Sequence, residues 1–231
     1  MTLVEHLEEL RWRLIKGLVA VVAGFALCFT FSHNLILLLS RPAQSVHAVK
    51  FIFTSPGEYF MSSVKVSFFA GLYLALPIIL YQLIAFLAPG LSPKERNWIA
   101  PITFGSFLLF TLGAVFAYFA ILPTGLHFLL TFAPSSIQPM LSIGTYIGFA
   151  AALLFASGLA FELPLVLLAL SWVGLVSSKL LSRFRQFAWV ATLVVGAIIT
   201  PSVNGFSQVM LAGALIILYE FSIWLIRFTG R

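Results

Sequence analysis

Carboxylates are the side chains in this sequence best suited to a binding role. All seven acidic residues are glutamates, and two of them, from two different polar stretches, are the candidates considered first. Glu9 belongs to the polar N-terminal stretch, and Glu95 lies in a polar segment between two long apolar runs. The two oxygens of a carboxylate match the planar donors of a guanidinium. Two such carboxylates on one surface would suit a ligand with two neighbouring arginines.

Each of these two glutamates also has a cation nearby in the sequence with which it could simply form an ion pair. Glu9 precedes Arg13 by four residues, the spacing of an ordinary helix ion pair worth about 0.2–0.5 kcal/mol. Glu95 stands directly between Lys94 and Arg96. Residue types alone therefore favour local pairing over a shared binding site.

Glu162 is the one glutamate near the middle of a long apolar run. A charge at the centre of a membrane span costs at least about 2.5–3.5 kcal/mol, so this side chain should point inward, be protonated or have a polar partner. Pro164 should loosen the backbone beside it, and Ser157 is a nearby hydroxyl. Two interpretations remain open: a polar contact site for a partner, or a structural hydrogen bond between spans.

The composition predicts that these residues are carried by membrane-spanning helices. The hydrophobic fraction is 61% and only 9% of residues are charged, against roughly 25% in soluble domains. We therefore expect an all-α, polytopic membrane protein that forms a single domain over residues 1–231. Its predicted elements are an amphipathic surface helix over residues 1–13 and six spans at about 14–39, 64–88, 98–122, 146–173, 186–199 and 206–226.

The distribution of cations predicts the orientation. Only Arg41, Lys50 and Lys65, of the thirteen Lys and Arg residues, fall on one side of the predicted spans. The positive-inside rule then places both termini and the Glu95 segment in the cytoplasm, or in the stroma of a thylakoid.

Several kinds of chemistry are disfavoured by what the sequence lacks. It contains no Asp, no His-Glu-x-x-His zinc motif and no phosphate-binding loop. Ser157-Gly158 lacks the preceding glycine of a rhomboid-like protease, and Cys28 is a lone cysteine. We expect no enzymatic activity, no metal or other cofactor and no nucleic-acid partner. A secondary transporter of a small solute is the alternative function, although it would show internal inverted symmetry, of which Pro77 and Pro164 give only a hint.

Four stretches of the sequence together resemble one family. Residues 6–13, His-Leu-Glu-Glu-Leu-Arg-Trp-Arg, are similar to the N-terminal signature of TatC, the multi-spanning receptor of the twin-arginine export pathway. Residues 76–96 resemble the second span and first cytoplasmic loop of that family, and residues 161–164, Phe-Glu-Leu-Pro, resemble a motif of its fourth span. Residues 199–220 look like its fifth-to-sixth-span region.

The resemblance implies a six-helix, glove-shaped protein with a concave face, which recognises signal peptides carrying consecutive arginines. It implies peptide-binding carboxylates at Glu9 and Glu95, with Phe86 beside them. Arg11 and Arg13 match the basic part of the N-terminal signature.

The family also implies roles for two residues outside that site. Pro42 matches a functionally important proline of the first external loop, and Glu162 matches a buried polar site that faces the concavity. Asn204 and Ala214 depart from the family pattern, which often has an acidic residue and a proline at these positions.

The resemblance further implies how the protein works and with what. Single-span subunits of the TatA/TatB type would pack near spans five and six, in a hetero-oligomeric complex with several copies of this chain. Folded proteins would be exported by the proton-motive force without ATP. The expected location is the plasma membrane, with the thylakoid membrane as the other possibility.

Overall fold

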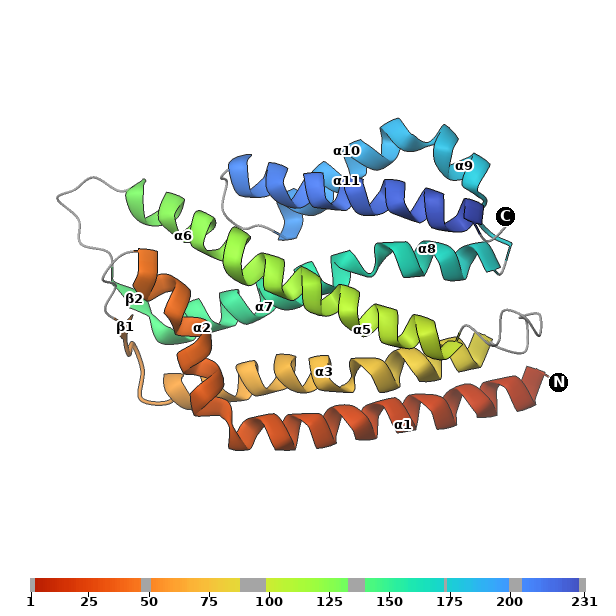
Figure 1. Cartoon of the computed structure of the whole chain (residues 1–231). Coiled ribbons are helices and arrows are strands. Elements are labelled where there is room, and N and C mark those ends of the chain that lie inside the picture. Colours follow the sequence, from red (N-terminus) through yellow and green to blue (C-terminus); the bar gives the residue numbers. More distant parts are fainter. Residues whose placement is uncertain are drawn as a thin grey trace.

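Long apolar helices form the body of the protein (Figure 1). The computed structural model describes residues 3–46, 51–87, 99–132, 140–172, 174–199 and 205–228. Its elements are α1 (Leu3–Thr30), α2 (Ser32–Val46), β1 (Phe51–Ile52), α3 (Glu58–Leu87), α5 (Ile99–Phe116), η2 (Ala117–Ile121), α6 (Leu122–Thr131), β2 (Leu141–Ser142), α7 (Ile143–Phe161), α8 (Leu163–Trp172), α9 (Ser178–Arg183), α10 (Arg185–Ile199) and α11 (Gly205–Phe228).

Five stretches in the described ranges are long and apolar enough to cross a membrane. They are Leu7–Thr30, Glu58–Phe86, Ile99–Thr131, Ile143–Trp172 and Gly205–Phe228. A sixth apolar helix, Arg185–Ile199, is shorter. The predicted all-α, multi-pass membrane fold is therefore confirmed, with one small addition. Phe51 and Ile52 pair in parallel with Leu141 and Ser142 as a two-residue β bridge.

The first two helices differ from the predicted boundaries. The amphipathic stretch over residues 1–13 runs directly into the first span, as predicted, because α1 continues without a break from Leu3 to Thr30. It stops well before the predicted end of that span at Leu39, and the chain turns into α2 at Ser32. The Thr30 hydroxyl donates to the Leu27 carbonyl at 2.7 Å, so a polar side chain takes up a carbonyl at the helix end.

The third span also runs further than predicted. The prediction ends it just before Pro123, yet the helix continues to Thr131. A π turn at Ala117–Ile121 precedes the proline, and there the N–H of Leu122 donates to the carbonyl of Ala117. A proline lacks the N–H that would donate to a carbonyl of the preceding turn. Pro123 is the second residue of α6, directly after the π turn, so the missing donor lies at the junction of two helical segments and not in the middle of one. The predicted fourth span, by contrast, divides into α7 and α8 at Glu162.

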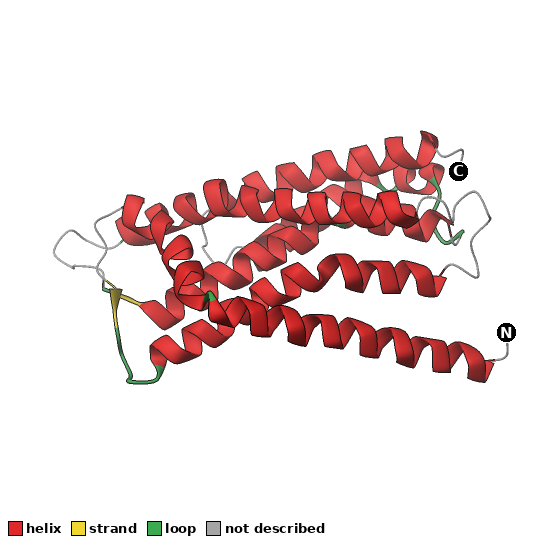
Figure 2. Ribbon diagram, turned by 60° about the horizontal axis from the view of Figure 1, so that its bottom comes forward, coloured by secondary structure: helices red, strands yellow, loops and turns green. Residues whose placement is uncertain are grey.

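The elements share two ends, which we name by what lies there. The start of α1, the end of α3, the start of α5 and the end of α11 lie at one end of the bundle, the terminal end (Figure 1). The β bridge lies at the opposite end, the strand end (Figure 2). One apolar core joins α2, α3, α6, α7 and α11, and a second joins α3, α5, α8, α9 and α11.

Helix α1 lies at the edge of the bundle and packs mainly on α3. A Cβ added to Gly24 would lie 2.7 Å from the carbonyl oxygen of Gly71, and one added to Gly71 would lie 2.5 Å from the nitrogen of Phe25. Glycine at both positions lets the two backbones approach closely, as in small-residue contacts between membrane helices. Most other apolar side chains of α1 are exposed, so this helix offers them to lipid or to a partner.

A single carboxylate holds the strand end together. Glu58, the first residue of α3, accepts hydrogen bonds on Oε2 from the nitrogen and hydroxyl of Thr54, at 2.5 and 2.7 Å, and from the nitrogen of Ser55 at 3.3 Å. Its Oε1 accepts from the Ser142 hydroxyl and, at 2.7 Å, from the nitrogen of Gly144. Glu58 thus ties the segment before α3 to the start of α7, a role that the sequence did not reveal.

Candidate peptide-binding site

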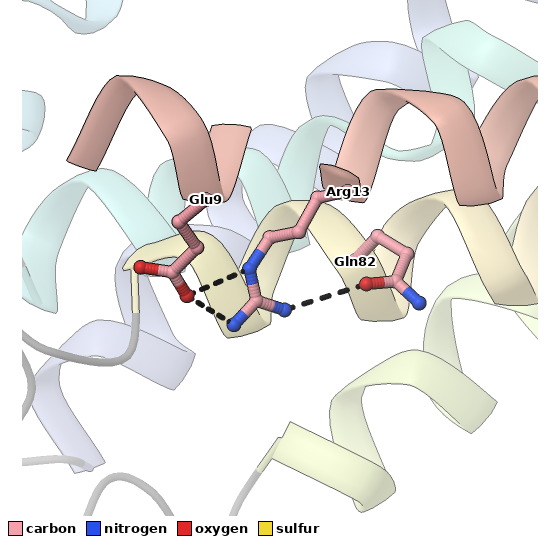
Figure 3. A network of polar contacts seen from close by, with 3 residues as sticks. All are labelled: Glu9, Arg13 and Gln82. Atoms are coloured by element: carbon pink, nitrogen blue, oxygen red, sulfur yellow. Dashed lines mark hydrogen bonds and ion pairs between the residues drawn. The ribbon is translucent and has the colours of Figure 1, made fainter. Parts of the chain in front are cut away.

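Glu9 and Arg13 lie one turn apart on α1, on the face that meets α3 (Figure 3). The Nε and Nη2 of Arg13 donate to Oε1 of Glu9 at 2.9 and 2.5 Å. Nη1 of Arg13 makes a longer contact of 3.4 Å with Oε1 of Gln82 on α3. The two charged side chains are 23% and 21% exposed. The structure therefore contains the local pair predicted from the four-residue spacing, in a half-buried position between two helices.

Gln82 was not predicted as a site residue. It is the one amide in the apolar run over residues 66–88, which is the signal that could have found it. Phe86 follows Gln82 by four residues, so it lies on the same face of α3, one turn nearer the terminal end. Its side chain is half-buried. The structure thus brings Phe86 to the same region as Glu9 and Arg13.

Arg11 is separated from this cluster. It follows Glu9 by two residues, which on a helix turns it to the far side. Its side chain is exposed, and its guanidinium lies 5.6 Å from the centre of the Trp12 ring. Arg11 and Arg13, which the resemblance grouped as one basic pair, therefore occupy different surroundings.

Glu95 lies outside the described residues. It belongs to the segment between the end of α3 at Leu87 and the start of α5 at Ile99, and both of these helix ends lie at the terminal end, as does the start of α1 (Figure 1). Glu9 lies two turns into α1. The sharing of a ligand between Glu9 and Glu95 stays a prediction.

Glu162 is buried where α7 ends and α8 begins. Its side chain is 4% exposed, and Oε2 accepts a hydrogen bond of 2.5 Å from the hydroxyl of Ser106 on α5. Within the described part of the chain, Oε1 has no hydrogen-bond partner. The nearby Ser157 is also fully buried, but its hydroxyl does not bind Glu162. The expected polar partner therefore exists, and it is Ser106 rather than Ser157.

Pro42 is buried inside α2, where it lacks the N–H that would reach the carbonyl of Leu38. The hydroxyl of Tyr118 in η2 donates to that carbonyl instead, at 2.8 Å. In the same turn, the hydroxyl of Tyr146 on α7 donates to the carbonyl of Leu39 at 2.7 Å. Because of Pro42, the Leu38 carbonyl is available to the Tyr118 hydroxyl, and this hydrogen bond joins α2 to η2.

Comparison with known proteins agrees with this arrangement. A family model described as "Sec-independent protein translocase protein (TatC)" matches residues 5–213. This chain belongs to the TatC family. The family predicted from the four sequence motifs is thereby confirmed.

Relatives in the TatC family come from chloroplasts and bacteria. The chloroplastic TATC of Oryza sativa subsp. japonica is 41% identical over all of this chain, which spans 64% of that relative's length. TatC of Aquifex aeolicus is 41% identical, with 100% of this chain and 97% of the relative covered. TatC of Synechocystis is 39% identical, with 100% and 90% covered.

A solved TatC structure shares the fold. The crystal structure of the twin-arginine translocase receptor TatC matches with a TM-score of 0.83 and 40% identity, covering 98% of this chain and 100% of that one. The five membrane-length stretches of the described ranges, together with the short α10, therefore share the fold of that TatC structure.

Proposed function

We propose that this TatC-family chain is the signal-peptide receptor of a twin-arginine translocase, with Glu9 and Glu95 binding the paired arginines. The observation that carries this proposal is the state of Glu9. Its carboxylate already binds one guanidinium, that of Arg13, through two nitrogens at 2.9 and 2.5 Å. A peptide arginine would bind by displacing Arg13, because it offers the same donors to the same carboxylate.

The position of Glu9 supports a site shared with Glu95. Glu9 lies on the α3-facing side of α1, near the end of α3 from which the Glu95 segment departs. Phe86 on α3 offers an aromatic surface beside this departure, against which the apolar part of a signal peptide would lie.

Charge supports a cytoplasmic location for this site. Arg11 and Arg13 belong to the first half of α1, Arg183 to α9 and Arg227 to the last turn of α11, and the start of α1, the helix α9 and the end of α11 lie at or near the terminal end (Figure 1). Because cytoplasmic ends carry an excess of Lys and Arg, both termini are proposed to face the cytoplasm. The plasma membrane is the proposed location, with the thylakoid as the alternative.

The short helix α10 is the proposed contact for single-span TatA/TatB-type subunits. Its fifteen residues reach about 22 Å at 1.5 Å per residue, less than the ~30 Å hydrocarbon core. Only Thr192 and Gly196 of α10 are buried, so most of its apolar surface is open. Glu162 would supply a buried polar contact for such a partner.

Export of folded proteins would be driven by the proton-motive force.

Photo-crosslinking tests the receptor proposal. A photoreactive phenylalanine at position 86 keeps an aromatic side chain there and leaves both carboxylates in place. It is probed in membranes with a signal peptide bearing Arg-Arg or Lys-Lys. Crosslinking should require Arg-Arg, because lysine lacks the planar fork.

Charge-neutral variants then assign the carboxylates. Glu9→Gln and Glu95→Gln should each weaken peptide binding at least about tenfold, since a hydrogen bond to a charged group contributes about 1.5–3 kcal/mol. Glu8→Gln is the matched control, because Glu8 is adjacent but exposed. Equal crosslinking by Lys-Lys, or unchanged binding by Glu9→Gln, would refute the proposal.

A further inference from the structure

An apolar cavity of about 410 Å³ lies between α2, α3, α5–η2 and α7. Its walls include Leu38 of α2, Phe69 of α3, Ala114 of α5 and Leu154 of α7. Among the described residues that line it, none is charged.

The few hydroxyls in the wall are bound to other groups. Tyr73 and Thr111 contact each other at 2.8 Å. The hydroxyl of Tyr118 donates to the Leu38 carbonyl at 2.8 Å. The wall therefore offers hydrocarbon to an occupant and leaves these hydroxyl groups already bonded, which suits an apolar chain rather than a polar solute.

The cavity opens sideways from membrane-spanning helices. Three of its lining side chains are well exposed: Leu38 at 44%, Val115 at 48% and Phe119 at 72%. These residues lie on α2, α5 and η2, so the rim is apolar on both sides. A rim of this kind faces the acyl region of a bilayer, where the molecules available to enter are lipids.

A cation stands at the edge of this rim. Arg41 follows Leu38 by three residues on α2, so it lies on the same face of that helix, and its side chain is exposed. Arg41 makes no ion pair within the described ranges. α2 belongs to the half of the bundle near the strand end (Figure 1), so Arg41 lies toward the membrane surface rather than at its centre.

We propose that this cavity binds an anionic phospholipid, with one acyl chain between α2, α5 and α7 and the phosphate beside Arg41. The apolar wall accounts for the chain, and the exposed guanidinium accounts for the negative headgroup, since Arg binds phosphate through its planar fork. The lipid would bridge α2 to the central helices on the side where Leu38 and Phe119 leave the rim open.

Native mass spectrometry of the full chain tests this proposal. The protein is reconstituted with equal amounts of phosphatidylglycerol and phosphatidylcholine and then released from the membrane. One retained phosphatidylglycerol is expected. Arg41→Gln should lower the preference for phosphatidylglycerol about fivefold, the effect of one Lys or Arg on attraction to anionic lipid. Lys65→Gln is the matched control, since Lys65 is another exposed cation, but it lies on α3 with its side chain near Gly148 of α7 rather than on α2 beside Leu38.

A second variant tests the acyl chain. Ala114→Leu fills the cavity without changing charge and should abolish retention of either lipid, while circular dichroism reports whether the helices remain. Phosphatidylcholine retained as well as phosphatidylglycerol, or retention unchanged in Ala114→Leu, overturns the proposal. A photo-crosslinker at Val115 that captures signal peptide in place of lipid also overturns it.

Discussion

Arg13 binds the carboxylate of Glu9 with two of its nitrogens, at 2.9 and 2.5 Å, and turns its third toward α3. An ion pair between helix residues four apart could form in α1 without any second helix. The contact with Gln82, 69 residues away in sequence, makes the same arginine part of the packing between α1 and α3. The pair that local spacing predicts is thus also a contact between two helices.

Arg13→Lys should loosen the terminal end of α1 from α3. A lysine ammonium is compact and lacks the fork that lets Arg13 contact Glu9 and Gln82 together. Spin labels at the exposed Leu7 and Leu83, in a background without Cys28, would report a broader distance distribution. Arg11→Lys is the control, because Arg11 is exposed beside Trp12. Equal broadening in both variants would contradict a specific role for the Arg13 fork, because the charge is unchanged in each.

Pro42 and Tyr118 should be energetically coupled. Tyr118→Phe leaves the Leu38 carbonyl without its 2.8 Å donor, and a net loss of about 0.5–1.5 kcal/mol in unfolding free energy is expected. In a Pro42→Ala background the restored N–H can reach that carbonyl, so the same change should cost less. A double-mutant cycle on denaturant unfolding in detergent measures the difference. Additive effects would contradict the coupling.

Ser106→Ala should destabilise the protein by about 1–3 kcal/mol, because it removes the hydroxyl that donates to the buried Glu162. Glu162→Gln keeps an oxygen that can accept the same hydrogen bond, so it should cost less stability. Thermal unfolding in one detergent compares the two. Ser157→Ala is the control, because the Ser157 hydroxyl is buried yet does not bind Glu162. If Ser106→Ala is as stable as the wild type, the hydrogen bond contributes nothing.

Glu58→Gln should loosen the strand end. Each of the groups that hydrogen-bonds to the Glu58 side chain is a donor, and these donors reach both carboxylate oxygens. An amide in either orientation turns its own NH₂ donor toward some of them, so at least one part-buried donor loses its acceptor at a cost of about 0.5–1.5 kcal/mol. Faster hydrogen exchange at the start of α7 and a lower unfolding temperature are expected. Glu8→Gln, on the exposed side of α1, should change neither.

Local patterns were enough to predict the membrane fold and the family. Apolar runs long enough to cross a bilayer mark the spans, and the short α10 corresponds to a short apolar run in the sequence. The motifs around Glu9, Phe86 and Glu162 identified the family, because they keep both residue type and spacing. Pro123 shows where such reasoning fails. From local sterics a proline predicts the end of a helix. Here a π turn directly precedes Pro123, so the missing N–H falls at the junction of two helical segments and the helix continues to Thr131.

The partners of the polar residues were decided only by tertiary structure. Ser106 meets Glu162 across 56 residues, and Tyr118 meets Leu38 across 80. These pairs depend on how each helix is rotated about its axis and how far it slides along its neighbour. Packing sets both quantities, and in apolar spans many rotations present similar side chains to lipid. The sequence by itself therefore determined which residues are polar and on which span they lie, while the packing of the helices decided which of them meet.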